Sequence, residues 1–162
     1  MMSINTIISH GFNLSNLNSI KVGIVTSQWN NDITSMLKNS CDNYLINAGL
    51  NKTNIYHIDV PGSMELVVAS DLLIKKKKIE GVIALGCIIK GETNHDKYIS
   101  QSVCAGLLDV SLKNGLPVIF GVLTTNSKKQ AFERAVGKSG NKGEDAAYSF
   151  LKMIELKESL NN

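Results

Sequence analysis

The sequence predicts an α/β fold in three layers, with helices on both faces of a central four-stranded parallel sheet. Two observations predict this class. Short runs rich in β-branched residues alternate along the chain with longer segments whose apolar residues recur at helical spacing. The short runs are also almost continuously apolar, as expected of parallel strands buried on both faces. The 162 residues fit a single domain, residues 1–162, in which the polar residues 1–20 form an N-terminal arm or edge strand.

The first half of the chain contains two predicted strands and two predicted helices. Residues 21–27 (KVGIVTS) are apolar and β-branched, the pattern of a buried strand. Residues 32–48 carry apolar side chains at helical spacing, and Gly49 is suited to end that helix. A second strand is expected at 55–60 and a second helix at 63–78.

The second half continues the alternation and ends in two helices. Residues 81–89 and 117–125 are apolar strands, and a helix over 98–112 lies between them. Helical patterns over 128–136 and 144–156 complete the chain. The alternation implies right-handed βαβ units, and because the strands look buried on both faces, helices should cover both sides of the sheet. The predicted fold is therefore a flavodoxin-like sandwich.

Composition and charge exclude several classes of function. The formal net charge is +3, which is too small to indicate a nucleic-acid-binding protein without a clustered basic patch. The only charge run, residues 75–78, is interpreted as a solvated helix end. The chain contains 17 Asn, 17 Ile and 16 Lys but a single arginine, Arg134. Because Lys and Asn are so abundant, their presence on the surface is weak evidence of function. The single arginine is stronger evidence, since Lys could have replaced it almost anywhere.

The cysteines and the N-terminus predict a soluble, cytoplasmic protein. Cys41, Cys87 and Cys104 are odd in number and lack C-x-x-C spacing, which argues against a disulfide framework or a zinc site. Residues 1–18 lack the pattern of a signal peptide. The longest apolar stretch, residues 116–123, is too short to span a bilayer, so no membrane association is expected.

Ligands of open parallel sheets bind beyond the carboxyl ends of the strands. This rule selects the loops at residues 28–30, 61–65, 87–95 and 124–126 as the candidate site. In the first loop, Trp29 either stacks on a flat heterocycle or serves as a core or subunit-contact aromatic.

The second and third loops also offer functional and structural interpretations. Gly62-Ser63 offers free helix amides to an anion or carbonyl, or is only an N-cap, and Glu65 beside it complements the helix dipole. Residues 91–93 (Gly-Glu-Thr) form a plausible phosphate cradle. His95 is a candidate acid/base, although a surface histidine remains the alternative.

Cys87 and Arg134 each carry a side chain that could take part in chemistry. Cys87 and His95 could form a nucleophile pair, but Cys87 continues an apolar strand, which disfavours this. The guanidinium of Arg134 suits a phosphate, and a structural ion pair is the alternative. Gly137-Lys138-Ser139 imitates a P-loop, but the motif requires glycine where Glu133 stands.

Five blocks of this sequence resemble the lumazine synthase family, in the family's order and spacing. The resemblance extends over residues 21–156, and its blocks are residues 27–30 (SQWN), 60–65 (VPGSME), 84–95 (ALGCIIKGETNH), 121–125 (GVLTT), and 133–135 (ERA) followed by 140–143 (GNKG). Lys90 and Val136-Gly137 depart from the usual Arg and Gly-Thr of the family.

The resemblance implies an enzyme of riboflavin biosynthesis. The family condenses 5-amino-6-(D-ribitylamino)uracil with 3,4-dihydroxy-2-butanone 4-phosphate, releases phosphate and water, and uses no metal or redox cofactor. Carried over residue by residue, it makes His95 the general acid/base. It assigns the phosphorylated ketone to Glu92, Thr93 and Arg134. It assigns the pyrimidine and ribityl chain to Trp29, Asn30, Ser63, Met64, Glu65, Cys87, Ile88, Ile89, Phe120 and Lys142, with Phe120 supplied by a neighbouring subunit.

The resemblance also implies partners. Family members form pentamers with active sites between subunits, and some build shells of sixty subunits. The compact segment 134–142 favours the shell here, and riboflavin synthase becomes a candidate partner. Two other hypotheses stay open: a non-catalytic flavin- or lumazine-binding shell protein, and a flavodoxin-like electron carrier.

Overall fold

The computed structural model describes residues 11–137 and 140–161. Its sheet has four parallel strands, as the sequence predicted, and their order across the sheet is β2-β1-β3-β4. The two central strands are therefore β1 and β3, and the two edges are β2 and β4. The strands are β1 (Val22–Ser27), β2 (Ile55–Val60), β3 (Gly81–Ile89) and β4 (Val118–Thr125).

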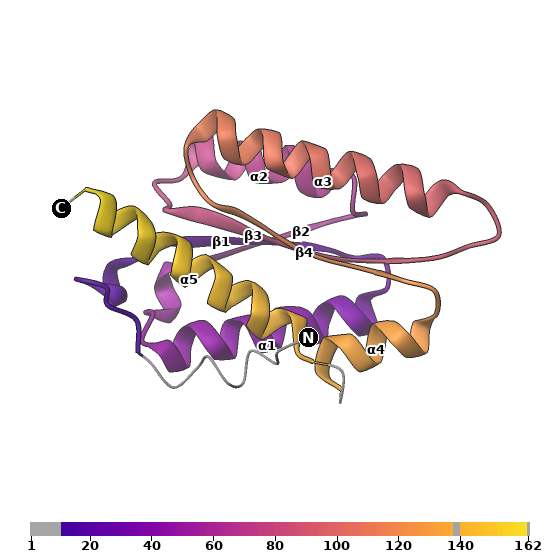
Figure 1. Ribbon diagram of the computed structural model, residues 1–162, viewed down its shortest axis with the longest axis horizontal. Coiled ribbons are helices and arrows are strands. Elements are labelled where there is room, and N and C mark those ends of the chain that lie inside the picture. Colours follow the sequence, from indigo (N-terminus) through magenta and orange to yellow (C-terminus); the bar gives the residue numbers. More distant parts are fainter. Residues whose placement is uncertain (1–10, 138–139, 162) are drawn as a thin grey trace.

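The helices cover both faces of this sheet, which confirms the three-layer arrangement (Figure 1). Helices α2 and α3 lie on one face, and α1, α4 and α5 lie on the other. Short 3-10 turns, η2 and η3, precede β1 and β2. The helices are α1 (Asn31–Ala48), α2 (Glu65–Lys76), α3 (His95–Asn114), α4 (Lys128–Val136) and α5 (Lys142–Leu160), with η2 at Leu17–Ser19 and η3 at Lys52–Asn54.

Two helices are longer than the periodicity predicted. Helix α3 begins at His95 rather than at residue 98, because its first turn is polar and exposed and gives no apolar signal. Helix α5 begins at Lys142 rather than at residue 144, where the Asn141 side chain accepts a hydrogen bond from the Glu144 amide (3.3 Å). Gly49 ends α1 with φ 115°, as predicted.

The expectation that all four strands are buried on both faces was wrong for the two edges. Every residue of β1 is buried, and β3 is buried up to Ile88. The middle of β2 and part of β4 are exposed instead, including His57 and Phe120. Edge strands keep one flank open to solvent, so polar residues are tolerated there.

The N-terminal segment that the structure describes packs on the last helix of the same chain. The amides of Asn13 and Ser15 donate to the carboxylates of Glu155 (2.6 Å) and Glu158 (3.0 Å) of α5. Residues 11–20 contain no strand, so the edge-strand alternative fails there, and residues 1–10 of the expected arm lie outside the described residues. Within the described part of the chain, no helix is long and apolar enough to cross a membrane.

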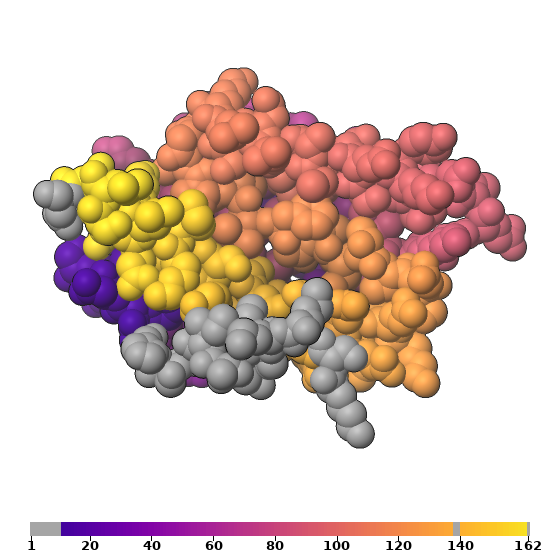
Figure 2. Space-filling model, viewed as in Figure 1, coloured from indigo at the N-terminus to yellow at the C-terminus, as the bar shows by residue number. Residues whose placement is uncertain are grey.

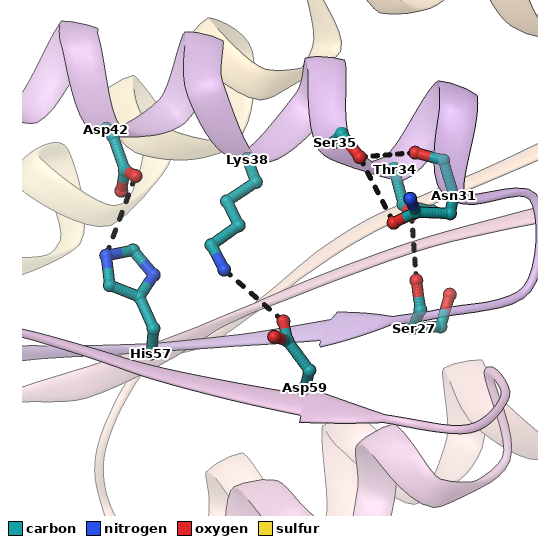
Figure 3. A network of polar contacts seen from close by, with 8 residues as sticks. All are labelled: Ser27, Asn31, Thr34, Ser35, Lys38, Asp42, His57 and Asp59. Atoms are coloured by element: carbon teal, nitrogen blue, oxygen red, sulfur yellow. Dashed lines mark hydrogen bonds and ion pairs between the residues drawn. The ribbon is translucent and has the colours of Figure 1, made fainter.

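A polar network joins α1 to the exposed edge strand β2 (Figure 3). Lys38 contacts Asp59 at 3.3 Å, and Asp42 contacts Nε2 of His57 at 3.5 Å. The buried Oδ1 of Asp42 finds no hydrogen-bond partner among the described residues. Burial raises the pKa of the Asp42 carboxyl and outweighs the opposing attraction of the nearby cations.

Because burial of the charged Asp42 carboxylate costs more than its cationic neighbours return, we expect Asp42→Asn to stabilise the protein at pH 7 by about 0.5–1 kcal/mol. With a raised folded-state pKa, the carboxyl is best tolerated when protonated, and stability is lost as pH rises through that pKa. The gain should therefore disappear when the pH falls below 3.8, the ordinary value of the group. Thermal unfolding between pH 3 and pH 8 measures it.

The matched control is Asp59→Asn, which removes a more exposed carboxylate from the same strand–helix contact. We expect this control to change stability by less than about 0.5 kcal/mol. A clear loss of stability in Asp42→Asn at pH 7 would mean that the ion pair with His57 outweighs burial.

Candidate functional site

Hydrogen bonds tie the loop after β1 to the end of β2 and to the last part of β3, at one edge of the sheet. The amides of Gln28 and Trp29 donate to the carbonyls of Val60 (2.8 Å) and Pro61 (3.1 Å) at the end of β2. The Asn30 side chain donates from Nδ2 to the carbonyl of Cys87 in β3 (2.9 Å). These bonds connect the first two loops and the end of β3 into one rim, at the edge where the sequence predicted the site.

A first cavity of about 590 Å³ opens beneath this rim, and we call it the Trp29 cavity. It collects residues from all three loops and from the first two turns of α3. Ten of the fourteen predicted site residues line it: Trp29, Asn30, Ser63, Met64, Glu65, Cys87, Ile88, Ile89, Thr93 and His95.

The Trp29 ring lies at the mouth of the cavity and is not part of the core. Its residue is 63% exposed, so the core alternative for this aromatic is wrong. Gly62 makes the approach possible, because a Cβ there would lie 3.0 Å from the ring. The Gly62 amide donates to Oε2 of Glu65 (2.8 Å), which fixes that carboxylate at the start of α2.

Cys87 and His95 both line the Trp29 cavity, but they do not form a nucleophile pair. Burial raises the pKa of the Cys87 thiol to about 11, so the thiolate is scarce at neutral pH. His95 is exposed and begins α3, where its backbone amide points to Oγ1 of Thr93 (3.4 Å). The His95 side chain is therefore accessible from the Trp29 cavity.

A second cavity of about 940 Å³ runs along the open edge of β4, and we call it the Arg134 cavity. It contains the predicted residues Phe120, Arg134 and Lys142, and it shares Ile88 and Asp96 with the Trp29 cavity. Figure 2 shows this face, where α3, β4, α4 and α5 come together.

The two cationic side chains of the Arg134 cavity differ in whether they form an ion pair. Lys142 forms an ion pair with Asp145 (2.7 Å). Arg134 is exposed, and no carboxylate among the described residues lies within ion-pair distance of it. The structural ion-pair alternative for Arg134 thus finds no support in the described part of the chain.

The structure does not bring every predicted residue together. Glu92 is exposed and lines neither cavity, and Arg134 lies in a different cavity from Thr93. The three residues assigned to the phosphorylated ketone are thus divided within one chain.

Sequence reasoning missed four residues of α3 that line the Trp29 cavity, of which Asp96 directly follows the predicted His95. Tyr98, Ile99 and Ser102 follow His95 at spacings of three, four and seven, which place them on one helical face. A helix start at His95 would have revealed them. Among the residues that the structure describes, no group of three or more His, Cys, Asp or Glu side chains could hold a metal ion.

A family model described as 6,7-dimethyl-8-ribityllumazine synthase matches residues 19–158. The chain belongs to this family. Curated proteins named 6,7-dimethyl-8-ribityllumazine synthase are similar over nearly the same span. One from Cytophaga hutchinsonii is 46% identical over 146 residues, covering 90% of this chain and 92% of the relative. Another from Porphyromonas gingivalis is 42% identical over 137 residues, covering 85% of each chain.

Membership of the lumazine synthase family confirms the resemblance found in the sequence blocks. The matched span contains all four strands and every residue that lines the two cavities. The family's description therefore applies to the part of the chain that builds the candidate site.

Proposed function

We propose that the chain is a 6,7-dimethyl-8-ribityllumazine synthase of riboflavin biosynthesis. It condenses 5-amino-6-(D-ribitylamino)uracil with 3,4-dihydroxy-2-butanone 4-phosphate and releases phosphate and water. The observation that carries the proposal is the Trp29 cavity, which gathers an exposed aromatic ring, polar groups and His95 within a family that has this activity.

The Trp29 cavity suits the pyrimidine substrate. The exposed indole offers a stacking face for the flat ring. The Ser63 hydroxyl and the Glu65 carboxylate lie on the same wall and suit the hydroxyl groups of the ribityl chain. We assign Met64, Cys87, Ile88 and Ile89 to the remaining wall, with Asn30 at its edge.

The proton transfers fall to His95. Imine formation, phosphate elimination and ring closure each move protons, and an imidazole can both accept and donate near neutral pH. No other histidine lines either cavity among the described residues. The enzyme otherwise accelerates the reaction by holding its two substrates in contact.

We infer that a complete site needs two copies of the chain. Arg134, Phe120 and Lys142 line the open edge of β4, outside the Trp29 cavity. Phe120 is 40% exposed there, which suits a residue that contacts a second copy. In the oligomer, the Arg134 cavity of one copy faces the Trp29 cavity of the next, and Arg134 joins Thr93 and Glu92 around the phosphorylated ketone.

The same reasoning extends to assembly. We assign residues 1–162 to one cytoplasmic domain, whose arm, residues 1–20, contributes to contacts in a homopentamer and a sixty-subunit shell. Only five residues separate α4 from α5, which supports the compact connection expected of shell-forming members. Sedimentation of the purified protein, alone and with riboflavin synthase, tests both the shell and that association.

The decisive experiment supplies both substrates and follows lumazine formation by absorbance and fluorescence, together with phosphate release. Equal amounts of lumazine and phosphate support the proposal. Tight lumazine binding without turnover would instead indicate the non-catalytic shell protein. Purification with bound flavin and no turnover would indicate the electron carrier.

We expect Arg134→Ala to raise the KM of the phosphorylated ketone about 10–100-fold, because a charged contact to phosphate is lost. The KM of the pyrimidine substrate should stay within about twofold. Initial-rate kinetics with each substrate varied in turn measure both values. An unchanged KM of the ketone would end this role for Arg134.

The matched control is Lys129→Ala, which removes an exposed cation from the same helix but outside both cavities. We expect no change in either KM. Oligomers mixed from His95→Ala and Arg134→Ala chains should recover activity if the site is shared, because some sites then receive both native residues.

A further inference from the structure

Asn30 has an unusual backbone conformation at the edge of the Trp29 cavity. Its φ and ψ are 57° and 45°, the left-handed region. It is the only non-glycine residue with positive φ among the described residues. Left-handed residues outside glycine are uncommon, and those at functional sites indicate a constraint that the surrounding structure maintains.

The Asn30 side chain completes the hydrogen bonding of β3 where β1 has ended. The β1–β3 pairing stops at Thr26 and Leu85, whereas β3 continues beside β4 as far as Ile89. Past Leu85, β3 therefore has no strand on its β1 side. Nδ2 of Asn30 donates to the Cys87 carbonyl there, at 2.9 Å.

This bond fixes the residue that precedes it. The Trp29 ring is largely exposed, so core packing does not hold it. Besides its contact with Gly62, its placement depends on its backbone, and the hydrogen bond from the Trp29 amide to the Pro61 carbonyl (3.1 Å) holds one side of that backbone. The other side is held by Asn30, through the bond to Cys87 and the sharp turn into α1.

We propose that Asn30 is a positioning residue that holds the Trp29 ring in place for the pyrimidine substrate, rather than a ligand of that substrate. The inference deepens the proposed function and rests on it for the identity of the substrate. Asparagine meets both demands of the position, because it tolerates the left-handed conformation and carries an amide donor.

Two substitutions of Asn30 separate the need for the left-handed conformation from the need for an amide donor. Asn30→Gly keeps the left-handed conformation accessible but removes the side-chain donor. Asn30→Asp keeps the size and shape but places a carboxylate oxygen against the Cys87 carbonyl. The matched control is Asn31→Asp, the same chemical change at the exposed neighbouring position, outside both cavities.

Trp29 reports its own position, because it is the only tryptophan of the chain. In the free protein, we expect both Asn30 variants to shift the emission maximum and increase acrylamide quenching, while Asn31→Asp matches the wild type. Both Asn30 variants should raise the KM of the pyrimidine substrate roughly 5–10-fold. The KM of the phosphorylated ketone should change less than about twofold.

Two results would overturn the proposal. Weaker pyrimidine binding with an unchanged Trp29 signal in the free variants would make Asn30 a direct substrate ligand. Unchanged signals and unchanged affinity would leave its amide without a role. The free-protein fluorescence needs no turnover, so an inactive wild type would refute the proposed function while the positioning of Trp29 is still measured.

Discussion

Replacing His95 with alanine should lower kcat about 10²–10⁴-fold, the usual contribution of a general acid/base. The fold should survive, because His95 is exposed at the first position of α3 and its side chain is not part of either core. Steady-state lumazine formation, with circular dichroism as a check on folding, measures the effect.

The matched control is His57→Gln, which removes a histidine that lies in β2 and contacts Asp42 instead of either cavity. Its kcat should equal that of the wild type. If His95→Ala turned over at the wild-type rate, the proton transfers would have to be assigned to water or to the substrates themselves.

Gly143→Ala should destabilise the protein by about 1–3 kcal/mol, the typical cost of overpacking. Gly143 is buried in the first turn of α5, where a Cβ would lie 2.3 Å from the Leu37 carbonyl oxygen and 2.9 Å from Cβ of Ser40 in α1. Backbone atoms cannot move aside as a flexible side chain can, so the two helices must separate. Urea or thermal unfolding measures the loss.

Gly11→Ala serves as the control, because no atom of the described residues lies within 4 Å of the added Cβ. The stability of this control should change by less than about 0.5 kcal/mol. Gly143→Ala should also weaken catalysis, since Lys142 next to it lines the Arg134 cavity. Wild-type stability in Gly143→Ala would show that α1 and α5 can separate at little cost.

The central part of the fold was predictable because its signal is local. β1 and β3 are apolar along almost their whole length, and a parallel sheet buries such strands completely. The predicted helix boundaries were wrong where this signal is missing. The first turn of α3 is polar, so its apolar periodicity does not mark where the helix begins. The exposure of the edge strands β2 and β4 was not predicted either. Which strands lie at the edges depends on strand order, and strand order depends on packing between distant segments.

The candidate site was predictable to the extent that it follows from topology. The carboxyl-end rule places the loops of Trp29, Ser63 and His95 together, and the structure agrees. The separation of Arg134 from Thr93 could not be predicted, since it depends on where α4 lies relative to β4. Nor could the Asn30 conformation, because the bond that supports it joins residues 57 positions apart.

The two cores differ in the length of chain that must be synthesised before they can form. The core on the α2–α3 face draws its buried residues from Val25 to Val122. The core on the other face extends from Ile20 to Ile154, and there the first helix packs against the last. During translation, the α2–α3 face of the sheet can therefore be covered before α5 has been synthesised. Until then, the apolar side of α1 remains exposed to solvent. We expect this interval to be the period of greatest exposure to aggregation and chaperone binding.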